Sequence, residues 1–314
     1  MTILEVKNLT KEFKDQKAVQ GISFELYSGE ILGLLGPNGA GKSTTINMLS
    51  MMMHGDDGEI YFHGKRVGNH KNLYKRQLGI VPQDIAIYEE ITAEANVMFF
   101  ASLYGLKGPE LIQSVHRALD FVGLLDKKTR KPKTFSGGMK RRLNIACAIA
   151  HEPEILIMDE PTVGIDPQSR KHILQSIKQL KEQGTSVIYT THYMEEVEEV
   201  ATRVVIMDHG KVIANGTKEA LKEELEEEKL YEIVVDQELG LLGDEWYEIE
   251  GVKQVDMEGT CIRIATVKGI ENLDKIISFL IDKGVRIQNI TSLSQSLEMV
   301  FLKLTGRRLR DEGE

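Results

Sequence analysis

Long hydrophobic runs are missing from this chain of 314 residues. A helix needs about 18 or more consecutive apolar residues to cross a bilayer. The longest apolar runs, such as Ile31–Leu35 and Ile155–Met158, have only the length of buried strands. The first residues, Met1–Lys7, also lack the basic, then apolar, then small-residue order of a signal peptide. We therefore expect a protein that does not cross a membrane by itself.

Cysteine is scarce, and an excess of positive charge is absent. The two cysteines, Cys147 and Cys261, lie far apart and form no metal-binding spacing, so we expect two unpaired buried thiols in a reducing cytoplasm. The net charge of −9 argues against a broad basic face for nucleic acid or anionic lipid, and no nucleic-acid partner is expected. The remaining composition is that of an ordinary globular protein.

A glycine-rich loop near the N-terminus is what the chain does have. It matches the phosphate-binding pattern G-x-x-x-x-G-K-[ST] and comprises Gly36, Pro37, Asn38, Gly39, Ala40, Gly41, Lys42, Ser43 and Thr44. It follows a strand-like run and precedes a helix-like one, which is the context that separates this motif from a chance turn. Its backbone N–H groups would surround a triphosphate. Lys42 would reach the terminal phosphates, and the Ser43 hydroxyl would ligate Mg²⁺.

Two adjacent carboxylates end a second apolar run. Asp159 and Glu160 follow Ile155–Met158. If that strand ends beside the phosphate loop, Asp159 can hold Mg²⁺, directly or through water, and Glu160 can act as a general base on an attacking water. Many strands end in solvated acidic turns, so it is the pairing with the phosphate loop that favours the catalytic interpretation.

A second anion site is suggested by Ser136, Gly137 and Gly138, which stand at the start of an expected helix, Lys140–His151. A hydroxyl, flexible amides and the helix dipole together attract negative charge. Alone, such a stretch is more often a simple loop. Here it lies shortly before the carboxylate strand, and that order is informative.

The chain as a whole alternates strands and helices over residues 1–217, as in an α/β layered domain, with a helical lobe at about 90–150. The expected strands are Leu4–Asn8, Ile22–Leu26, Ile31–Leu35, Glu59–His63, Gly79–Val81, Ile155–Asp159, Val187–Thr191, Val204–Asp208 and Lys211–Ala214. The expected helices of the lobe are Ala93–Tyr104, Pro109–Val122 and Gly138–His151.

The composition changes near residue 218. Residues 218–229 predict a charged linker helix. Residues 230–305 predict a small α+β accessory domain that resembles a ferredoxin-like unit. Its expected strands are Tyr231–Val235, Val252–Asp256, Cys261–Ala265 and Val285–Ile290, and its expected helices are 237–247, Ile270–Lys283 and Ser294–Leu304. We see no acid–base or metal cluster there and expect a role in dimer contact or regulation.

In their order, these motifs resemble the ATP-binding subunit of an ABC (ATP-binding cassette) transporter. The resemblance covers residues 1 to about 220. Besides the phosphate loop and the Asp159–Glu160 strand, the matching positions are Phe13, Gln83, the signature Phe135–Met139, the loop Gly164–Asp166 and His192. In that family an aromatic residue at the position of Phe13 stacks on adenine, although tyrosine is usual there.

The resemblance implies a P-loop cassette that hydrolyses ATP with Mg²⁺. Glu160 would be the base, and His192 would contact the terminal phosphate. Gln83 would contact Mg²⁺ or water and report the state of the nucleotide to an integral-membrane permease. Asp166 would belong to the nucleotide-binding residues.

The resemblance also implies two cassettes that dimerise head to tail, so that Ser136, Gly137 and Gly138 complete the site of the partner. We expect a homodimer, and the sequence leaves open whether the partner is identical. The implied location is cytoplasmic, peripheral on the cytoplasmic face of the cell membrane.

Three stretches point to the drug-exporter branch of the family: Ser136–Leu143, Pro161–Pro167 and the tail Ser296–Arg307. Three residues in the signature and the loop after the carboxylates depart from the common pattern: Phe135 where leucine is commonest, Met139 where glutamine is commonest, and Val163 where serine is usual. Two alternatives remain. One is a soluble ABC ATPase in translation or DNA repair, although the chain has one cassette and no room for a long coiled coil. The other is an ATP-dependent regulatory module, against which Glu160 and His192 argue.

Overall fold

The computed structural model describes residues 1–314 apart from 15, 226–227, 238–242, 294–295 and 306–314. The chain divides into two compact units. The first contains Met1–Lys218 and the end of helix α10 (Leu297–Thr305) from Phe301, and the second is Glu219–Val300. None of the helices within the described ranges combines enough length with enough apolar character to span a bilayer.

The first unit is built on a six-stranded sheet in the order β10-β9-β3-β8-β7-β6. Its strands are β3 (Ile31–Leu35), β6 (Leu78–Val81), β7 (Ile155–Asp159), β8 (Ser186–Thr190), β9 (Arg203–Asp208) and β10 (Lys211–Thr217). All neighbours are parallel except the edge strand β10. Because the carboxyl ends of parallel strands meet at one edge of a sheet, the loops after β3, β6, β7 and β8 converge there.

The buried strands of this sheet are apolar on both faces because each face is covered. Within β3, Ile31 belongs to a core cluster shared with the helical segments after β6, and Leu32 and Leu34 belong to a second cluster on the other face. That second cluster includes side chains of helix α1 (Lys42–Leu49) and of the antiparallel sheet β2-β1-β4-β5. This packing holds the start of α1 at the carboxyl edge of β3.

The antiparallel sheet consists of β1 (Thr2–Phe13), β2 (Gln16–Tyr27), β4 (Asp57–Phe62) and β5 (Lys65–Arg66), and α2 (Lys71–Arg76) follows it. In the β1–β2 hairpin, Phe13 pairs with Gln16. The hairpin also contacts the rest of the unit: the backbone N–H of Gln20 donates a hydrogen bond to the carbonyl oxygen of Gly210 at 2.8 Å. The end of the hairpin is thereby fixed near the loop that follows β3.

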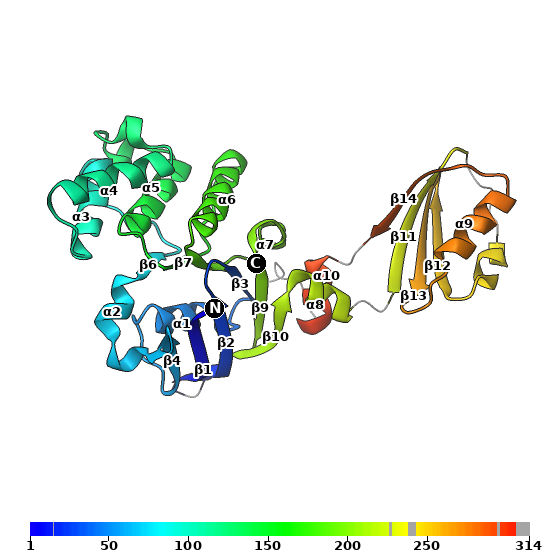
Figure 1. Ribbon diagram of the computed structural model, residues 1–314, viewed down its shortest axis with the longest axis horizontal. Helices are drawn as coiled ribbons and strands as arrows, with labels where there is room; N and C mark the ends of the chain where they lie inside the picture. Colours follow the sequence, from blue (N-terminus) through cyan, green and yellow to red (C-terminus); the bar gives the residue numbers. More distant parts are fainter. Residues whose placement is uncertain (15, 226–227, 238–242, 294–295, 306–314) are drawn as a thin grey trace. The chain divides into compact units, whose positions relative to one another are not determined.

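Helices α3 (Ala93–Leu103), α4 (Gly108–Phe121) and α5 (Gly137–Ile149) lie between β6 and β7 in the sequence and pack on one another (Figure 1). Thr92 caps α3, and Ser136 caps α5. Two further helices, α6 (Pro167–Glu182) and α7 (Met194–Val200), were not among the expected elements. α6 is amphipathic, with one buried stripe that includes Ile173 and Ile177, so its period was readable in the sequence.

The linker helix is shorter than expected. Helix α8 covers Lys218–Leu225, and strand β11 already begins at Glu228. In the strand, Glu228 and Lys229 lie opposite Val267 and Thr266, and their charges pair with Lys253 and Glu271. The prediction of helix up to residue 229 was therefore wrong at its end, because cross-strand pairing outweighs the high helix propensity of these two residues.

The second unit contains one antiparallel sheet in the order β12-β13-β11-β14. Its elements are β11 (Glu228–Val235), β12 (Val252–Glu258), β13 (Cys261–Val267), α9 (Leu273–Asp282) and β14 (Ile287–Leu293). Trp246 is fully buried in its core, on a 3₁₀ helix at Gly243–Glu248. The helix expected at 237–247 is replaced there by this tighter turn, and residues 238–242 lie outside the described part.

The two cysteines differ in exposure. Cys147 is buried in α5 and Cys261 is half-buried at the start of β13, and neither forms a disulfide. The expectation of two buried thiols is therefore wrong for Cys261, which is the first residue of β13, where burial is incomplete.

Candidate nucleotide-binding and catalytic site

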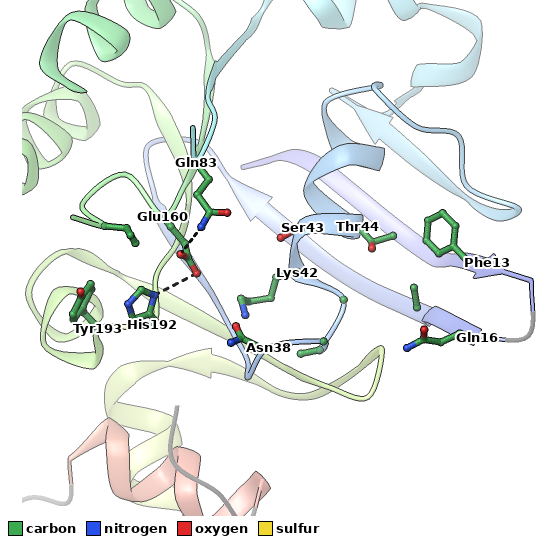
Figure 2. Close-up of a pocket in the computed structure, with 15 residues that line it drawn as sticks. Phe13, Gln16, Asn38, Lys42, Ser43, Thr44, Gln83, Glu160, His192 and Tyr193 are labelled. Carbon is green, nitrogen blue, oxygen red and sulfur yellow. Dashed lines mark hydrogen bonds and ion pairs between the residues drawn. The ribbon is translucent and has the colours of Figure 1, made fainter. Parts of the chain in front are cut away.

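A cavity of 880 Å³ opens at the carboxyl edge of the parallel sheet. It is lined by Phe13, Gln16, Ala18, Asn38, Gly39, Ala40, Gly41, Lys42, Ser43, Thr44, Gln83, Glu160, Val163, His192 and Tyr193. Figure 2 shows Phe13 and Gln16 on one side of Lys42, and Gln83, Glu160 and His192 on the other. The cavity therefore brings together residues that lie far apart in the sequence, from Phe13 to Tyr193.

The glycine-rich loop approaches neighbouring backbone too closely for any side chain at Gly41. This residue has φ 99°, and a Cβ atom there would lie 2.5 Å from the carbonyl oxygen of Ala18. Gly41 is also the last residue before α1, so the first N–H groups of the helix point at the cavity. A helix N-terminus with free N–H groups binds anions such as phosphate.

Lys42 lies inside this loop, where its Nζ donates to the carbonyl oxygens of Gly36 and Pro37 at 2.6 and 3.0 Å. Burial lowers the pKa of Lys42, and the carboxylates of Glu160 and Asp159 act in the opposite direction. The cation is thus close to both acidic residues and is held by groups that an anionic ligand can replace.

Glu160 forms the centre of the opposite wall. Its Oε2 accepts a hydrogen bond from Nε2 of Gln83 at 3.2 Å, and its Oε1 lies 3.4 Å from Nδ1 of His192 (Figure 2). The Glu160 backbone has φ 45°, and its N–H donates hydrogen bonds to the hydroxyl oxygen and the carbonyl oxygen of Thr190. A non-glycine residue held in the left-handed region marks a backbone over-determined by its surroundings.

Asp159 stands one residue behind this wall and is not among the residues that line the cavity. Its Oδ1 accepts from the Thr190 hydroxyl at 2.6 Å, and burial raises its pKa. The Ser43 hydroxyl is exposed at the cavity. Mg²⁺ prefers oxygen ligands and takes one or two from the protein when phosphates supply others. The hydroxyl of Ser43, the Asp159 carboxylate and the Gln83 amide oxygen are donors of the kind this ion prefers.

The signature residues lie elsewhere. Ser136 and Gly137 are exposed, and neither they nor Gly138 line the cavity. The Ser136 hydroxyl caps α5 by accepting from the Met139 N–H at 3.3 Å. A Cβ atom at Gly138 would lie 2.1 Å from the Ser169 hydroxyl, so only glycine permits this approach of α5 to α6.

Asp166 is likewise outside the cavity of its own chain. It caps α6, with its Oδ1 accepting from the Ser169 N–H at 2.9 Å. That hydrogen bond is the main reason why the pKa of Asp166 is lowered. Within one chain, the structure thus brings together the phosphate loop, Gln83, Glu160 and His192, but not Ser136, Gly137, Gly138 or Asp166.

Comparison with known proteins decides the family. A profile of the ABC transporter family matches residues 19–163. The linearmycin resistance ATP-binding protein LnrL of Bacillus subtilis (strain 168) is 44% identical over 314 residues, which covers 98% of this chain and 100% of that protein. The chain belongs to the ABC transporter family.

Two further members of this ABC family extend the comparison. The Nod factor export ATP-binding protein I of Rhizobium sp. (strain N33) is 35% identical, with 98% of each chain covered. A dimeric ATP-binding cassette solved in a post-hydrolysis state with ADP and Pi superposes with a TM-score of 0.62 at 25% identity, over 68% of this chain and 98% of that one.

These findings confirm the expected fold class, an ABC cassette of the P-loop α/β type. They also confirm the function class expected from the motifs: the chain is a nucleotide-binding ABC ATPase subunit that resembles the drug-exporter branch. In this family, ATP-binding subunits of exporters dimerise and work with a membrane permease.

The ABC motifs did not identify every residue of the cavity. Gln16, Ala18, Val163 and Tyr193 line it as well. Tyr193 directly follows His192, so its position could have been read from the motif itself. Gln16 and Ala18 could be found only from the pairing of β1 with β2, which places the start of β2 beside Phe13.

Proposed function

We propose that this ABC subunit binds ATP with Mg²⁺ in the cavity of Figure 2 and that hydrolysis drives export through a separate integral-membrane permease. The observation that carries the proposal is the arrangement around the cavity, where Lys42 and the helix N-terminus face a wall made of Glu160, Gln83 and His192. One side suits phosphate, and the other offers a base held by two polar partners.

In this mechanism the loop amides and Lys42 hold the β- and γ-phosphates. Lys42 exchanges its bonds to the carbonyl oxygens of Gly36 and Pro37 for phosphate oxygens. Phe13 is 43% exposed at the other end of the cavity, where its ring face can stack on the adenine of ATP. Ser43, Asp159 and Gln83 would hold Mg²⁺, which neutralises phosphate charge when it is bound.

Hydrolysis then needs a water in line with the γ-phosphate. Glu160 accepts a proton from this water as its oxygen bonds to the γ-phosphorus. The bond from that phosphorus to the β–γ bridging oxygen breaks, and ADP and phosphate result. His192 orients the water with Glu160 and faces the charge on the terminal phosphate.

Two chains would form each complete site, arranged head to tail as a homodimer. This proposal is supported by the exposed position of Ser136 and Gly137 at the N-terminus of α5, away from the cavity of the same chain. Their hydroxyl and amides can complete the phosphate site of a second copy. The solved cassette that binds ADP and Pi is itself dimeric, which supports the formation of a dimer.

The export direction is supported by the relatives, whose names state linearmycin resistance and Nod factor export. We propose a location on the cytoplasmic face of the cell membrane, because ATP and the permease meet there. The transported substrate is a property of that permease.

Residues 230–305 are proposed to be an accessory domain of the ferredoxin-like type, with a role in dimer contact or regulation. In order of appearance its strands lie as second, third, first and fourth, and all neighbours are antiparallel. Helix α9 joins the third strand to the fourth, as the β-α-β-β-α-β pattern requires.

Co-purification tests the transporter role. The tagged chain is isolated from gently solubilised native membranes, and the proteins bound to it are quantified by mass spectrometry. A multi-span membrane protein in stoichiometric amount is the expected result, with ATP turnover in the isolated complex. Recovery of only ribosomal or DNA-repair proteins would favour a soluble ABC ATPase. ATP binding without turnover would favour a regulatory module.

A further inference from the structure

A buried carboxylate lies directly behind the catalytic wall. Glu196, on helix α7, is 2% exposed, and one of its oxygens, Oε2, accepts three hydroxyl hydrogen bonds. The donors are Thr162 at 2.9 Å, Tyr189 at 2.6 Å and Thr191 at 2.8 Å. The other oxygen, Oε1, forms an ion pair with Nε of Arg170 on α6 at 3.4 Å. The carboxylate thus joins four segments of the chain.

A carboxylate so far from water is costly unless it is paired and hydrogen-bonded. Its three hydroxyl donors are themselves buried, so none of them can exchange this bond for water without opening the structure. Burial and the neighbouring Glu196 raise the pKa of Tyr189, so that its hydroxyl stays protonated as a donor. The cluster is therefore a buried junction between these segments.

The junction reaches His192 through both of its chain neighbours. The Thr191 hydroxyl donates to Glu196 and also accepts from the N–H of Tyr193 at 3.0 Å, so it spans His192. The Tyr193 ring lies 4.2 Å from the His192 ring, and the Arg170 guanidinium lies 4.3 Å from the centre of the Tyr193 ring. Contacts from Glu196 and Arg170 thus set the backbone and the ring environment of His192.

The same junction holds the chain next to Glu160. Thr162 follows Glu160 by two residues, and the N–H of Val163 donates to the Glu160 carbonyl oxygen at 3.3 Å. Glu196 therefore anchors both the loop after Glu160 and the residue before His192. The side chains of Glu160 and His192 themselves lie 3.4 Å apart in the cavity.

We propose that Glu196 is a positioning residue for ATP hydrolysis, which acts by holding the His192 segment and the loop after Glu160 in one fixed arrangement. The proposal rests on the roles proposed above for Glu160 and His192. Glu196 lies outside the cavity and touches no substrate. Its loss should therefore lower kcat and leave the binding of ATP almost unchanged.

Thr191→Val is the sharpest test, because it keeps the shape and removes only the hydroxyl. We expect kcat to fall about tenfold, since a displacement of about 1 Å in a catalytic group can cost up to 100-fold, whereas KM and the Kd of ATP stay near wild-type values. Thr191→Ser restores the hydroxyl and should restore kcat. Glu196→Gln should lower kcat at least as much as Thr191→Val.

Ser176→Ala is the matched control, because it removes another buried hydroxyl, which donates to the His172 carbonyl oxygen at 2.9 Å away from the site. It should leave kcat unchanged, and melting temperatures of all variants report their folding. A Thr191→Val protein with lowered melting temperature but normal kcat would overturn the proposal. So would a Thr191→Ser protein as slow as Thr191→Val.

A double substitution distinguishes positioning from an independent effect. In a His192→Ala background, Thr191→Val should slow single-turnover hydrolysis by a smaller factor than it does beside an intact His192, because part of its effect acts through His192. A second loss of the same factor would contradict this. If the unsubstituted chain hydrolyses no ATP, the proposed function fails, whereas active wild type with unaffected Thr191 and Glu196 variants refutes only the positioning role.

Discussion

The guanidinium group of Arg141 donates hydrogen bonds to the carbonyl oxygen of Gln83 and to that of Pro82, the latter at 2.6 Å. Arg141 is 3% exposed and lies on α5, the helix that Ser136 caps. The Gln83 side chain in turn donates to Glu160 in the cavity. A single buried cation thus connects the signature helix to the segment that contacts the catalytic carboxylate.

Arg141→Met should weaken both folding and turnover. The substitution removes two hydrogen bonds from a charged donor to the carbonyl oxygens of Pro82 and Gln83, and such a bond contributes about 1.5–3 kcal/mol. We expect a lower free energy of unfolding in urea and a lower kcat, because Gln83 is no longer held toward Glu160. Arg142→Met is the control, since the Nη1 of Arg142 donates to Val122 and not to the Gln83 segment. A normal kcat in Arg141→Met would show that the Gln83 segment is positioned without Arg141.

Lys42→Ala should abolish ATP binding measured by calorimetry. The substitution removes the cation that faces the terminal phosphates, and charge-assisted hydrogen bonds of this kind are among the strong ones. Lys140→Ala serves as the control, because Lys140 pairs with Glu89 outside the cavity. Unchanged ATP affinity in Lys42→Ala would remove Lys42 from the phosphate site.

Glu160→Gln should stop turnover and leave ATP bound. Glutamine keeps the shape and the contacts to Gln83 and His192 but cannot accept the proton of the attacking water, and loss of a general base costs about 10²–10⁴-fold in rate. We expect a stable dimer in the presence of Mg²⁺ and ATP, seen by light scattering. Glu154→Gln, which removes a carboxylate paired with His63 outside the cavity, should hydrolyse normally. Near-normal turnover in Glu160→Gln would exclude it as the base.

The cassette fold could be read from the sequence because its evidence is local. The phosphate loop is contiguous between Gly36 and Thr44, and the runs of buried residues around it are apolar on both faces. The end of the linker helix could not be read from the sequence. Glu228 and Lys229 favour helix and adopt a strand only through pairing with β13. Pairing between strands β11 and β13 therefore outweighed the local preference of these residues for helix.

The inner wall of the site shows the same limit. Glu160 and His192 stand in recognisable motifs, but Thr190, which supports both Asp159 and Glu160, becomes visible only when the register of β7 beside β8 is known. Glu196 was hidden for another reason, because a glutamate in an acidic stretch of an amphipathic helix is usually solvated. Its burial depends on three hydroxyl groups, two from the end of β8 and the residue that follows it and one, Thr162, from the loop after β7.

A half-buried histidine should make the stability of the cassette depend on pH. The His151 ring stacks on Tyr104 with ring centres 3.5 Å apart, and its Nε2 lies 3.3 Å from the Leu78 carbonyl oxygen. Burial lowers the pKa of His151 to about 4, whereas an unfolded chain has a histidine pKa of about 6.5. Between these values the unfolded chain binds more protons than the folded chain. The contribution of His151 to the free energy of unfolding is therefore complete above about pH 6.5 and is lost as the pH falls toward 4.

The expected loss of free energy of unfolding between pH 7 and pH 4 is about 2–3 kcal/mol, at ~1.36 kcal/mol per pKa unit. His151→Phe keeps the stacking on Tyr104 but does not titrate, so its free energy of unfolding in urea should fall less than that of wild type between pH 7 and pH 4. His54→Gln, a change at an exposed histidine, should behave as wild type. Equal pH dependence in wild type and His151→Phe would show that His151 is protonated in the folded protein as readily as in the unfolded chain. Its stacking on Tyr104 would then not exclude the proton.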